Sequence, residues 1–268
     1  MNDSGRIKIE DKIINSNLDS TDFHNKHFVR IGSKDQNFKK INFSHTYFEN
    51  CYFRNIVFDS CNFNGCKFIN CNFQGSTFPG SRFEYATFEK TFIDSEILDN
   101  NCPSWNNLTL KFARTLRTNY QGIGEAESVN KAIKIELQAT KEHLYESWKS
   151  KSAYYRNKYK GFDRLKMFFK WLNFKIQDII WGNGESPIKL FSTGLFLWIL
   201  ISILDTLFYK DPKILPNYVS SFCEVPSIFM GINKPADYPN LHLTLITIIR
   251  FIGFALFTSI IIKRFNRR

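Results

Sequence analysis

The feature that most constrains the fold of this chain is a period of five residues in its first hundred positions. Every fifth residue from Ile13 to Leu98 is a large apolar side chain, with Ser33 as the one exception. From Phe38 to Phe88 that residue is phenylalanine without interruption. An α-helix repeats every 3.6 residues and a strand every two, so neither element produces this spacing. The pattern therefore indicates an internal repeat.

A second column of mostly smaller side chains lies two residues before each phenylalanine. Its members are Ile41, Thr46, Cys51, Ile56, Cys61, Cys66, Cys71, Ser76, Ser81, Ala86 and Thr91. The other positions of each unit are mostly polar. This arrangement predicts a chain that turns a corner every five residues, with the large side chains on an axis and the small ones beneath the turns. We interpret the column's four cysteines as reduced core residues rather than a metal or redox cluster.

This pattern resembles the pentapeptide-repeat family, whose unit has a central Leu or Phe and a small residue two places earlier. Residues 16–20 (Ser-Asn-Leu-Asp-Ser) come close to its consensus, and the resemblance covers roughly residues 11–100. It implies a right-handed quadrilateral β-helix with four pentapeptides per coil. We expect this β-helix over residues 11–102, preceded by an N-terminal cap at residues 1–10.

The charge distribution bears on the partners of the chain. Of 36 basic and 25 acidic residues, residues 30–102 hold 8 of each, whereas residues 103–187 hold 15 basic and 8 acidic ones. Some pentapeptide-repeat proteins mimic DNA, which requires a strongly negative rod, and a balanced one does not meet that requirement. We therefore interpret the predicted β-helix as a rigid surface that binds an unknown cytoplasmic protein partner.

Two helical segments are expected after the repeat. Residues 103–150 predict a helical hairpin that covers the open edge of the β-helix with Trp105, Leu108, Phe112 and Leu116. Residues 151–187 predict a basic amphipathic helix lying among anionic lipid headgroups, a reading we prefer to nucleic-acid binding because an apolar span follows directly. Its headgroup-binding candidates are Lys158, Lys160, Arg164, Lys166, Lys170 and Lys175.

Residues 188–268 predict a membrane domain of two spans, about residues 190–208 and 241–262. Basic residues are concentrated before the first span and after the second. We therefore expect a protein of the inner membrane of a bacterium-like cell, with both termini in the cytoplasm. We expect no signal peptide, because the first residues are polar and contain no apolar segment. The intervening loop of about 30 residues would then face outward.

Each predicted span carries one charge, Asp205 in the first and Arg250 in the second. A mid-span arginine is unfavourable by at least about 2.5–3.5 kcal/mol on insertion scales and usually faces a bundle or a wet cavity. We predict that the two form a polar pair inside the bundle. The alternative is that Arg250 extends to the membrane surface without a function.

The C-terminal part resembles membrane members of the same family that continue into a two-helix domain similar to a potassium-channel pore. The resemblance covers about residues 105–268 and rests on residues 182–187 (Gly-Asn-Gly-Glu-Ser-Pro) and on Gly253, where such inner helices bend. A potassium filter needs a run such as T-x-G-Y-G. Phe229, Met230, Gly231, Ile232 and Asn233 form only a degenerate version of it.

No motif for catalysis, a cofactor or a metal is recognised, so we expect a protein that is not an enzyme. Two functions are left open. In the first, the β-helix is a sensing or interaction module coupled to a channel-like homo-oligomer that alters membrane permeability. In the second, the spans only anchor a protein-interaction scaffold. The degenerate filter favours the anchor, and Arg250, Asp205 and Gly253 favour the channel-like assembly, which we prefer.

Overall fold

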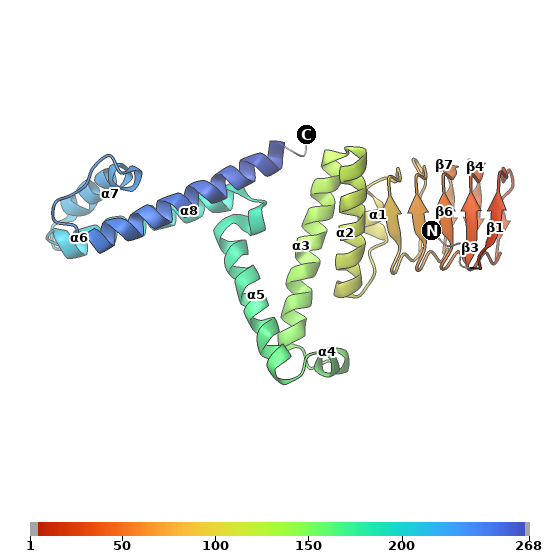
Figure 1. The fold of residues 1–268 in the computed structure, drawn as a ribbon, viewed down its shortest axis with the longest axis horizontal. Coiled ribbons are helices and arrows are strands. Elements are labelled where there is room, and N and C mark those ends of the chain that lie inside the picture. Colours follow the sequence, from red (N-terminus) through yellow and green to blue (C-terminus); the bar gives the residue numbers. More distant parts are fainter. Residues whose placement is uncertain (1–4, 266–268) are drawn as a thin grey trace. The chain divides into compact units, whose positions relative to one another are not determined.

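The computed structural model describes residues 5–265. The chain divides into two compact units, the first running to Phe168 and the second beginning at Phe169. The first unit contains a β-helix and helices that follow it, and the second contains two long apolar helices with a shorter helix between them (Figure 1).

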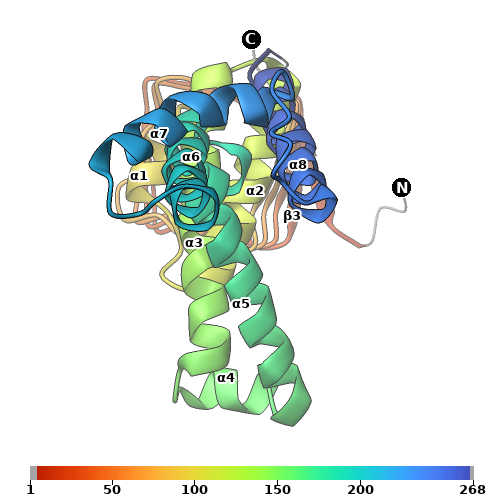
Figure 2. The ribbon, with the colours of Figure 1, turned by 90° about the vertical axis from the view of Figure 1, so that its left-hand side faces the viewer.

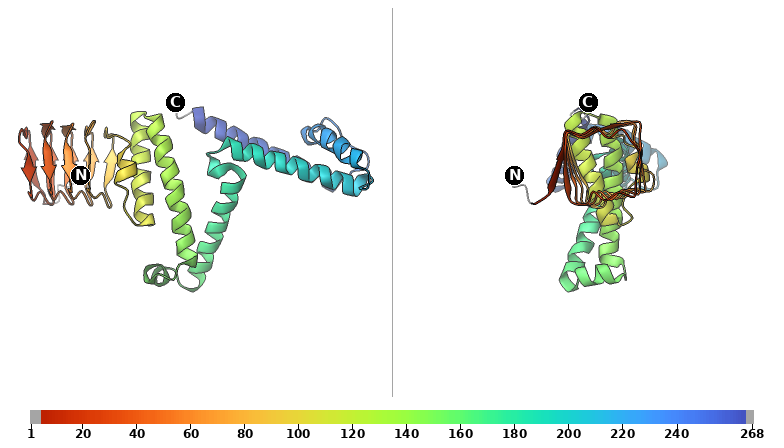
Figure 3. Two further views of the ribbon diagram at one scale, coloured as in Figure 1. Left: turned by 180° about the vertical axis from the view of Figure 1, so that it is seen from behind. Right: turned by 90° about the vertical axis from the view of Figure 1, so that its right-hand side faces the viewer.

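The β-helix is built from short parallel strands. They are β1 (Ile7–Glu10), β2 (Leu18–Asp19), β3 (Lys26–Val29), β4 (Gly32–Lys34), β5 (Asn37–Lys39), β6 (Tyr47–Glu49), β7 (Tyr52–Arg54), β8 (Val57–Asp59), β9 (Lys67–Ile69) and β10 (Thr87–Glu89). β1 and β3 pair at a spacing of nineteen residues. The other strand partners are twenty residues apart, as in Phe28, Phe48, Phe68 and Phe88 along one face. Twenty residues are four pentapeptides, so each coil has the four sides that the right-hand view of Figure 3 shows end on. The predicted β-helix is confirmed.

The interior of the β-helix is a stack of phenylalanine rings. Phe43, Phe63 and Phe83 lie one above another with ring centroids 5.0 and 4.9 Å apart. Rings from neighbouring corners meet edge to face, as Phe58 and Phe63 do at 5.4 Å. Both geometries are favourable for aromatic pairs. The large column of the repeat therefore fills the axis, as predicted.

The corners require a backbone conformation that most residues avoid. The second residue after each phenylalanine of the column from Phe38 to Phe88 has a positive φ, for example 54° at Asn50 and 47° at Lys90. Glycine occupies such corners at Gly65, Gly75 and Gly80, and most other corners carry a residue with a side chain. A left-handed conformation is unfavourable for such residues, so the stacking of successive coils must compensate for it.

The small column has a role beyond its size. The Ser81 hydroxyl accepts a hydrogen bond from the Cys61 N–H at 2.9 Å and donates one to the Phe58 carbonyl at 2.8 Å. Ser76 does the same with Ile56 and Phe53 of its neighbouring coil. The thiols of the column also donate to carbonyl oxygens 23 residues earlier, as Cys61 does to Phe38. These side chains therefore satisfy buried backbone groups at the corners.

The two ends of the β-helix differ. Residues 7–10, predicted to cap the β-helix, form strand β1 and pair with β3. This end has a hollow of about 230 Å³. Its lining consists of Ile9, Lys12, Ile14, Leu18, Phe23, Phe28 and Ile31.

The other end is covered by helix α2 (Asn106–Ile123), which follows the short α1 (Ile97–Asn100). The Asn119 side chain accepts from the Thr91 N–H at 2.8 Å and donates to the Thr91 carbonyl at 2.7 Å, replacing the missing next strand. Leu108, Phe112 and Leu116 are buried there as predicted. Trp105 is not buried: it precedes the first residue of the helix, and 60% of its surface is exposed.

Helix α3 (Ala126–Lys149) packs along α2 to complete the predicted hairpin. Its buried Glu136 is held between Arg114 and Arg117, at 3.0 and 3.2 Å. A buried carboxylate requires such partners. Helix α4 (Ala153–Lys158) and helix α5 (Gly161–Trp181) follow, and α5 crosses the boundary between the two units.

The second unit contains the 3₁₀ turn η1 (Gly182–Gly184), α6 (Pro187–Tyr209), α7 (Leu215–Met230) and α8 (Asn240–Phe265). The predicted spans lie inside α6 and α8, which are long and apolar enough to cross a bilayer. Only 17% and 11% of their most apolar windows are buried in the chain itself. Helix α7 lies within the segment expected as a loop, and Figures 1 and 2 show it folded back beside the ends of α6 and α8.

Candidate functional site

The candidate site is the group of polar contacts that hold α7 between α6 and α8. Thr206 and Ser221 are both buried, and the Thr206 hydroxyl donates to the Ser221 oxygen at 2.9 Å. The contact joins α6 to α7 at a level three residues from the C-terminal end of α6.

A second contact between α6 and α7 compensates for a proline. Pro226 lies inside α7 and has no N–H, so the Phe222 carbonyl four residues earlier lacks its helical donor. The Trp198 indole N–H of α6 donates to that carbonyl at 2.8 Å, and the two rings stack with centroids 4.7 Å apart. Helix α6 therefore supplies the hydrogen bond that α7 cannot form by itself.

Asp205 is the buried acid of the site, with 3% of its surface exposed. It accepts a hydrogen bond from the Tyr238 hydroxyl, and the Lys210 ammonium lies 3.6 Å from its other oxygen. Lys210 also contacts Glu224 of α7 at 3.0 Å. The Tyr238 ring stacks against His242 with centroids 4.8 Å apart. Asp205 therefore fixes the segment that leads into α8.

Arg250 of α8 contacts the C-terminal end of α7. Its Nη1 donates to the Phe229 carbonyl at 3.4 Å, and a Cβ at Gly231 would clash with the same nitrogen. Gly231 ends α7 in the left-handed conformation, with φ of 77°. Carbonyl groups at a helix C-terminus carry partial negative charge, which favours a cation there.

Within one chain the structure does not bring Asp205 and Arg250 together, and the predicted polar pair is not formed there. Asp205 lies four residues from the end of α6, and Arg250 lies ten residues after the start of α8. With a rise of about 1.5 Å per residue, the two differ in depth by roughly 9 Å if the ends of α6 and α8 are level. Each therefore finds a different partner.

The predicted degenerate filter occupies the end of α7 and the turn after it. Phe229 and Met230 are the last helical residues, and the Ile232 and Asn233 N–H groups donate back to the Ser227 carbonyl at 2.9 and 3.2 Å. Residues 231–239 have no regular secondary structure. At Gly253, the predicted hinge, α8 is continuous and a Cβ would meet no neighbouring atom, so the hinge stays a prediction.

The predicted headgroup-binding residues flank an exposed apolar face of α5. Phe162, Leu165, Phe169, Ile176 and Ile179 are exposed and recur at helical spacing. Lys158, Lys160, Arg164, Lys166 and Lys170 are exposed, and Lys175 is half-buried.

Near this segment, a hydrogen bond with the Tyr154 hydroxyl raises the pKa of Lys158, and burial lowers the pKa of His143. The first shift keeps Lys158 charged. The arrangement suits contact with an anionic, partly apolar surface.

The histidines of the β-helix contact side chains of neighbouring coils. His24 contacts Ser44 and His27 contacts Glu49, each beside the next coil, and all six cysteines are free. Within residues 5–265 there is no cluster of three or more metal-ligating side chains.

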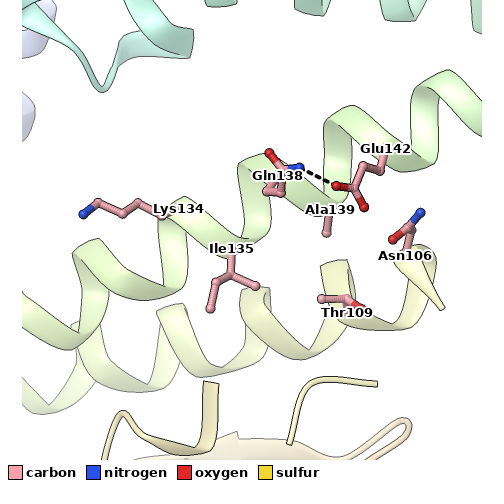
Figure 4. Close-up of a pocket in the computed structure, with 7 residues that line it drawn as sticks. All are labelled: Asn106, Thr109, Lys134, Ile135, Gln138, Ala139 and Glu142. Atoms are coloured by element: carbon pink, nitrogen blue, oxygen red, sulfur yellow. Dashed lines mark hydrogen bonds between the residues drawn. The ribbon is translucent and has the colours of Figure 1, made fainter. Parts of the chain in front are cut away.

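A groove of about 330 Å³ lies between α2 and α3 (Figure 4). Its lining is Asn106, Thr109, Lys134, Ile135, Gln138, Ala139 and Glu142. Gln138 donates to Glu142 one turn later on α3. The groove offers neither a nucleophile with a base nor a pair of carboxylates.

Sequence reasoning missed α7 and the residues that hold it. The available signals were Pro216 in the first helical turn and Gly231 just past the helix end, which are typical start and stop residues. Nothing in the sequence alone connects Trp198 with Phe222, or Tyr238 with Asp205.

The comparisons with known proteins concern the repeat. The family model described as a pentapeptide repeat region matches residues 21–96. A search of curated proteins found no match to the chain.

Among solved structures, the chain is similar to the pentapeptide repeat protein Rfr23 from the cyanobacterium Cyanothece 51142, at 14% identity and a TM-score of 0.28, over 32% of this chain and 69% of that one. It is also similar to QnrB1, a plasmid-mediated fluoroquinolone resistance protein, at 18% identity and a TM-score of 0.15. That match covers 31% of this chain and 56% of QnrB1. Residues 21–96 are therefore a pentapeptide-repeat region.

Proposed function

We propose that this protein is an oligomeric, channel-like membrane protein in which α6, α7 and α8 of several copies surround a water-filled pathway. The pentapeptide-repeat β-helix would be a cytoplasmic module that binds a protein partner, and the basic face of α5 would bind anionic headgroups. The basic residues that flank the two spans support this orientation in an inner membrane.

The observation that carries the proposal is the depth that α7 reaches. Trp198 lies eleven residues before the end of α6, and Arg250 lies ten residues after the start of α8, yet both contact α7. At about 1.5 Å per residue, these contacts lie roughly 15 Å from the helix ends. That depth is near the middle of a hydrocarbon core of about 30 Å. Helix α7 is therefore better described as re-entrant than as part of an external loop.

The segment after α7 then begins at membrane depth without regular structure. Ile232, Asn233 and Lys234 are exposed in the single chain. Irregular backbone is tolerated inside a bilayer only where it is buried in protein or lines a water-filled cavity, because lipid offers no hydrogen-bond partners. One chain leaves this segment uncovered, which favours an oligomer with the segment toward its centre.

The test is ion flux through liposomes of phosphatidylethanolamine and phosphatidylglycerol that contain the full-length protein. In a Cys223→Ser background, Asn233→Cys should react with a membrane-impermeant thiol reagent, and the reaction should block the flux. The matched control is Leu245→Cys on the exposed apolar face of α8, where the same reagent should leave flux unchanged.

An inserted oligomer without flux would overturn the proposal. The alternative function would then apply, in which the two spans anchor the β-helix as a protein-interaction scaffold. Pull-down experiments with the β-helix as bait would become the next step.

A further inference from the structure

Arg250 determines the charge of the site at the depth where α7 ends. Its side chain is half-buried, and its one polar contact among the described residues is the Phe229 carbonyl. Within residues 5–265 no carboxylate forms an ion pair with it. Asp205, the other charge of the spans, is held by Tyr238 and by Lys210. Among the described residues, the positive charge of Arg250 therefore meets the partial charge of a helix end and the Phe251 ring, whose centroid lies 5.4 Å away, but no full negative charge.

The end of α7 has little negative potential left for a permeating cation. The Gly231 N–H donates to the Ile228 carbonyl, and two further N–H groups donate to the Ser227 carbonyl. Arg250 takes the Phe229 carbonyl. A helix C-terminus attracts cations through such carbonyl groups when they are free. Here those three carbonyls already have donors from the chain itself.

Two separate requirements for water meet at this point. The irregular backbone from Gly231 onward needs water or protein around it at membrane depth. A mid-span guanidinium has the same requirement, and it faces a bundle interior or a wet cavity for that reason. Arg250 contacts the last turn of α7. It also lies close to the start of the irregular segment, since a Cβ added at Gly231 would clash with its guanidinium. Both needs are met by one wet cavity.

We propose that Arg250 makes the pathway selective for small inorganic anions such as chloride, with each copy contributing one guanidinium to a ring of positive charge. Rings of Arg or Lys side chains favour anions in pores, and acidic rings or carbonyl filters favour cations. This inference rests on the proposed function and adds the class of ion. It also gives a physical reason for the departure from a potassium filter.

The test is the reversal potential of the full-length protein in planar bilayers with a tenfold KCl gradient. Wild-type current should reverse close to the chloride equilibrium potential. Arg250→Gln should lower the chloride-to-potassium permeability ratio by about tenfold or more, because a charge is removed beside the ion path. Arg250→Lys keeps the charge and should retain the preference.

The matched control is Lys213→Gln, which removes one positive charge from an exposed position between α6 and α7. It should leave the permeability ratio unchanged. Wild-type current that reverses near the potassium equilibrium potential would overturn the inference and leave the channel proposal standing. An inserted oligomer that carries no current would overturn both. The wild-type reversal potential by itself shows whether anions or cations are preferred. The inference can therefore be tested even if a variant fails to assemble.

Discussion

The β-helix and the α6–α7–α8 unit hold their polar groups in opposite ways. In the β-helix the hydroxyls and thiols of the small column make the same kind of contact from one coil to the next, as Ser76 and Ser81 do. In the α6–α7–α8 unit each polar contact occurs once and joins unlike groups, as Trp198 and Phe222 do. Periodic contacts can be recognised in a sequence, and single contacts between distant residues cannot.

The two regions also differ in where their aromatic residues lie. Phe63 is fully buried in the ring stack of the β-helix, whereas Phe196 of α6 is 64% exposed. A buried ring leaves a cavity when it is removed, and a lipid-facing ring is replaced by lipid. The difference predicts unequal costs for the same substitution.

The largest expected effect is that of Phe63→Ala. It should lower the free energy of unfolding of the β-helix by about 3–5 kcal/mol, because it removes a ring that contacts Phe43 and Phe83 and leaves a cavity. Phe196→Ala should change the unfolding of the α6–α7–α8 unit by less than about 1 kcal/mol. The effect of Phe63→Ala is measured by denaturing the full-length protein in detergent while the β-sheet signal is monitored by circular dichroism. Equal costs for the two substitutions would remove the contrast.

A smaller effect is expected from alkaline pH. Burial raises the pKa of the Cys61 thiol to about 11, and its ordinary value is near 9. The neutral thiol is therefore favoured by folding, so the stabilisation is complete below pH 9 and is lost as the pH rises toward 11. The loss is about 2–3 kcal/mol. Cys61→Ser keeps a donor for the Phe38 carbonyl and should remove this part of the pH dependence.

The control for the pH experiment is Cys223→Ser in α7, since Cys223 is exposed. Denaturant titrations of the three proteins between pH 8 and 11 should separate Cys61→Ser from the other two. If all three curves lose stability in parallel, the buried thiol is not the cause.

The smallest effect concerns the single contacts of the α6–α7–α8 unit. Trp198→Phe keeps the ring that stacks on Phe222 but removes the donor to its carbonyl. Hydrogen bonds inside membrane proteins average about 0.6 kcal/mol, with a maximum near 1.7, so a loss in that range is expected. Pro226→Ala supplies a helical N–H for the same carbonyl and should restore most of the loss.

A double-mutant cycle in bicelles measures this coupling. Pro226→Ala alone serves as the control, because the carbonyl then has two possible donors. Additive effects of the two substitutions would show that Trp198 does not compensate for the proline.

Much of the first region could be predicted from residue order. The unbroken phenylalanine column predicted a turn every five residues and the buried rings, because a repeat places equivalent residues in equivalent surroundings. The four sides of each coil followed from the resemblance to the pentapeptide-repeat family. The hydrogen bonds of the small column were not foreseen. Cys61 and Ser81 were read by their size, and the donor groups that they share became visible only once the coils were stacked.

Less of the candidate site could be predicted. The two spans and the charges at Asp205 and Arg250 were identified, since a charge in an apolar run stands out. Their predicted pairing is not formed within one chain, and sequence distance gave no depth for residues on different helices. Gly253, the headgroup contacts of α5 and the conduction of ions stay predictions.

The sequence by itself determined the β-helix, its balanced surface charge and the two apolar helices, because each follows from composition or period along one segment. Only the tertiary structure decided that α7 folds back between α6 and α8, that Trp198 compensates for Pro226, and that Arg250 binds the end of α7. The physical reason is that these contacts depend on the depth and rotation of helices that are separate in sequence. Such quantities are set by packing between helices and by the need to satisfy every buried polar group.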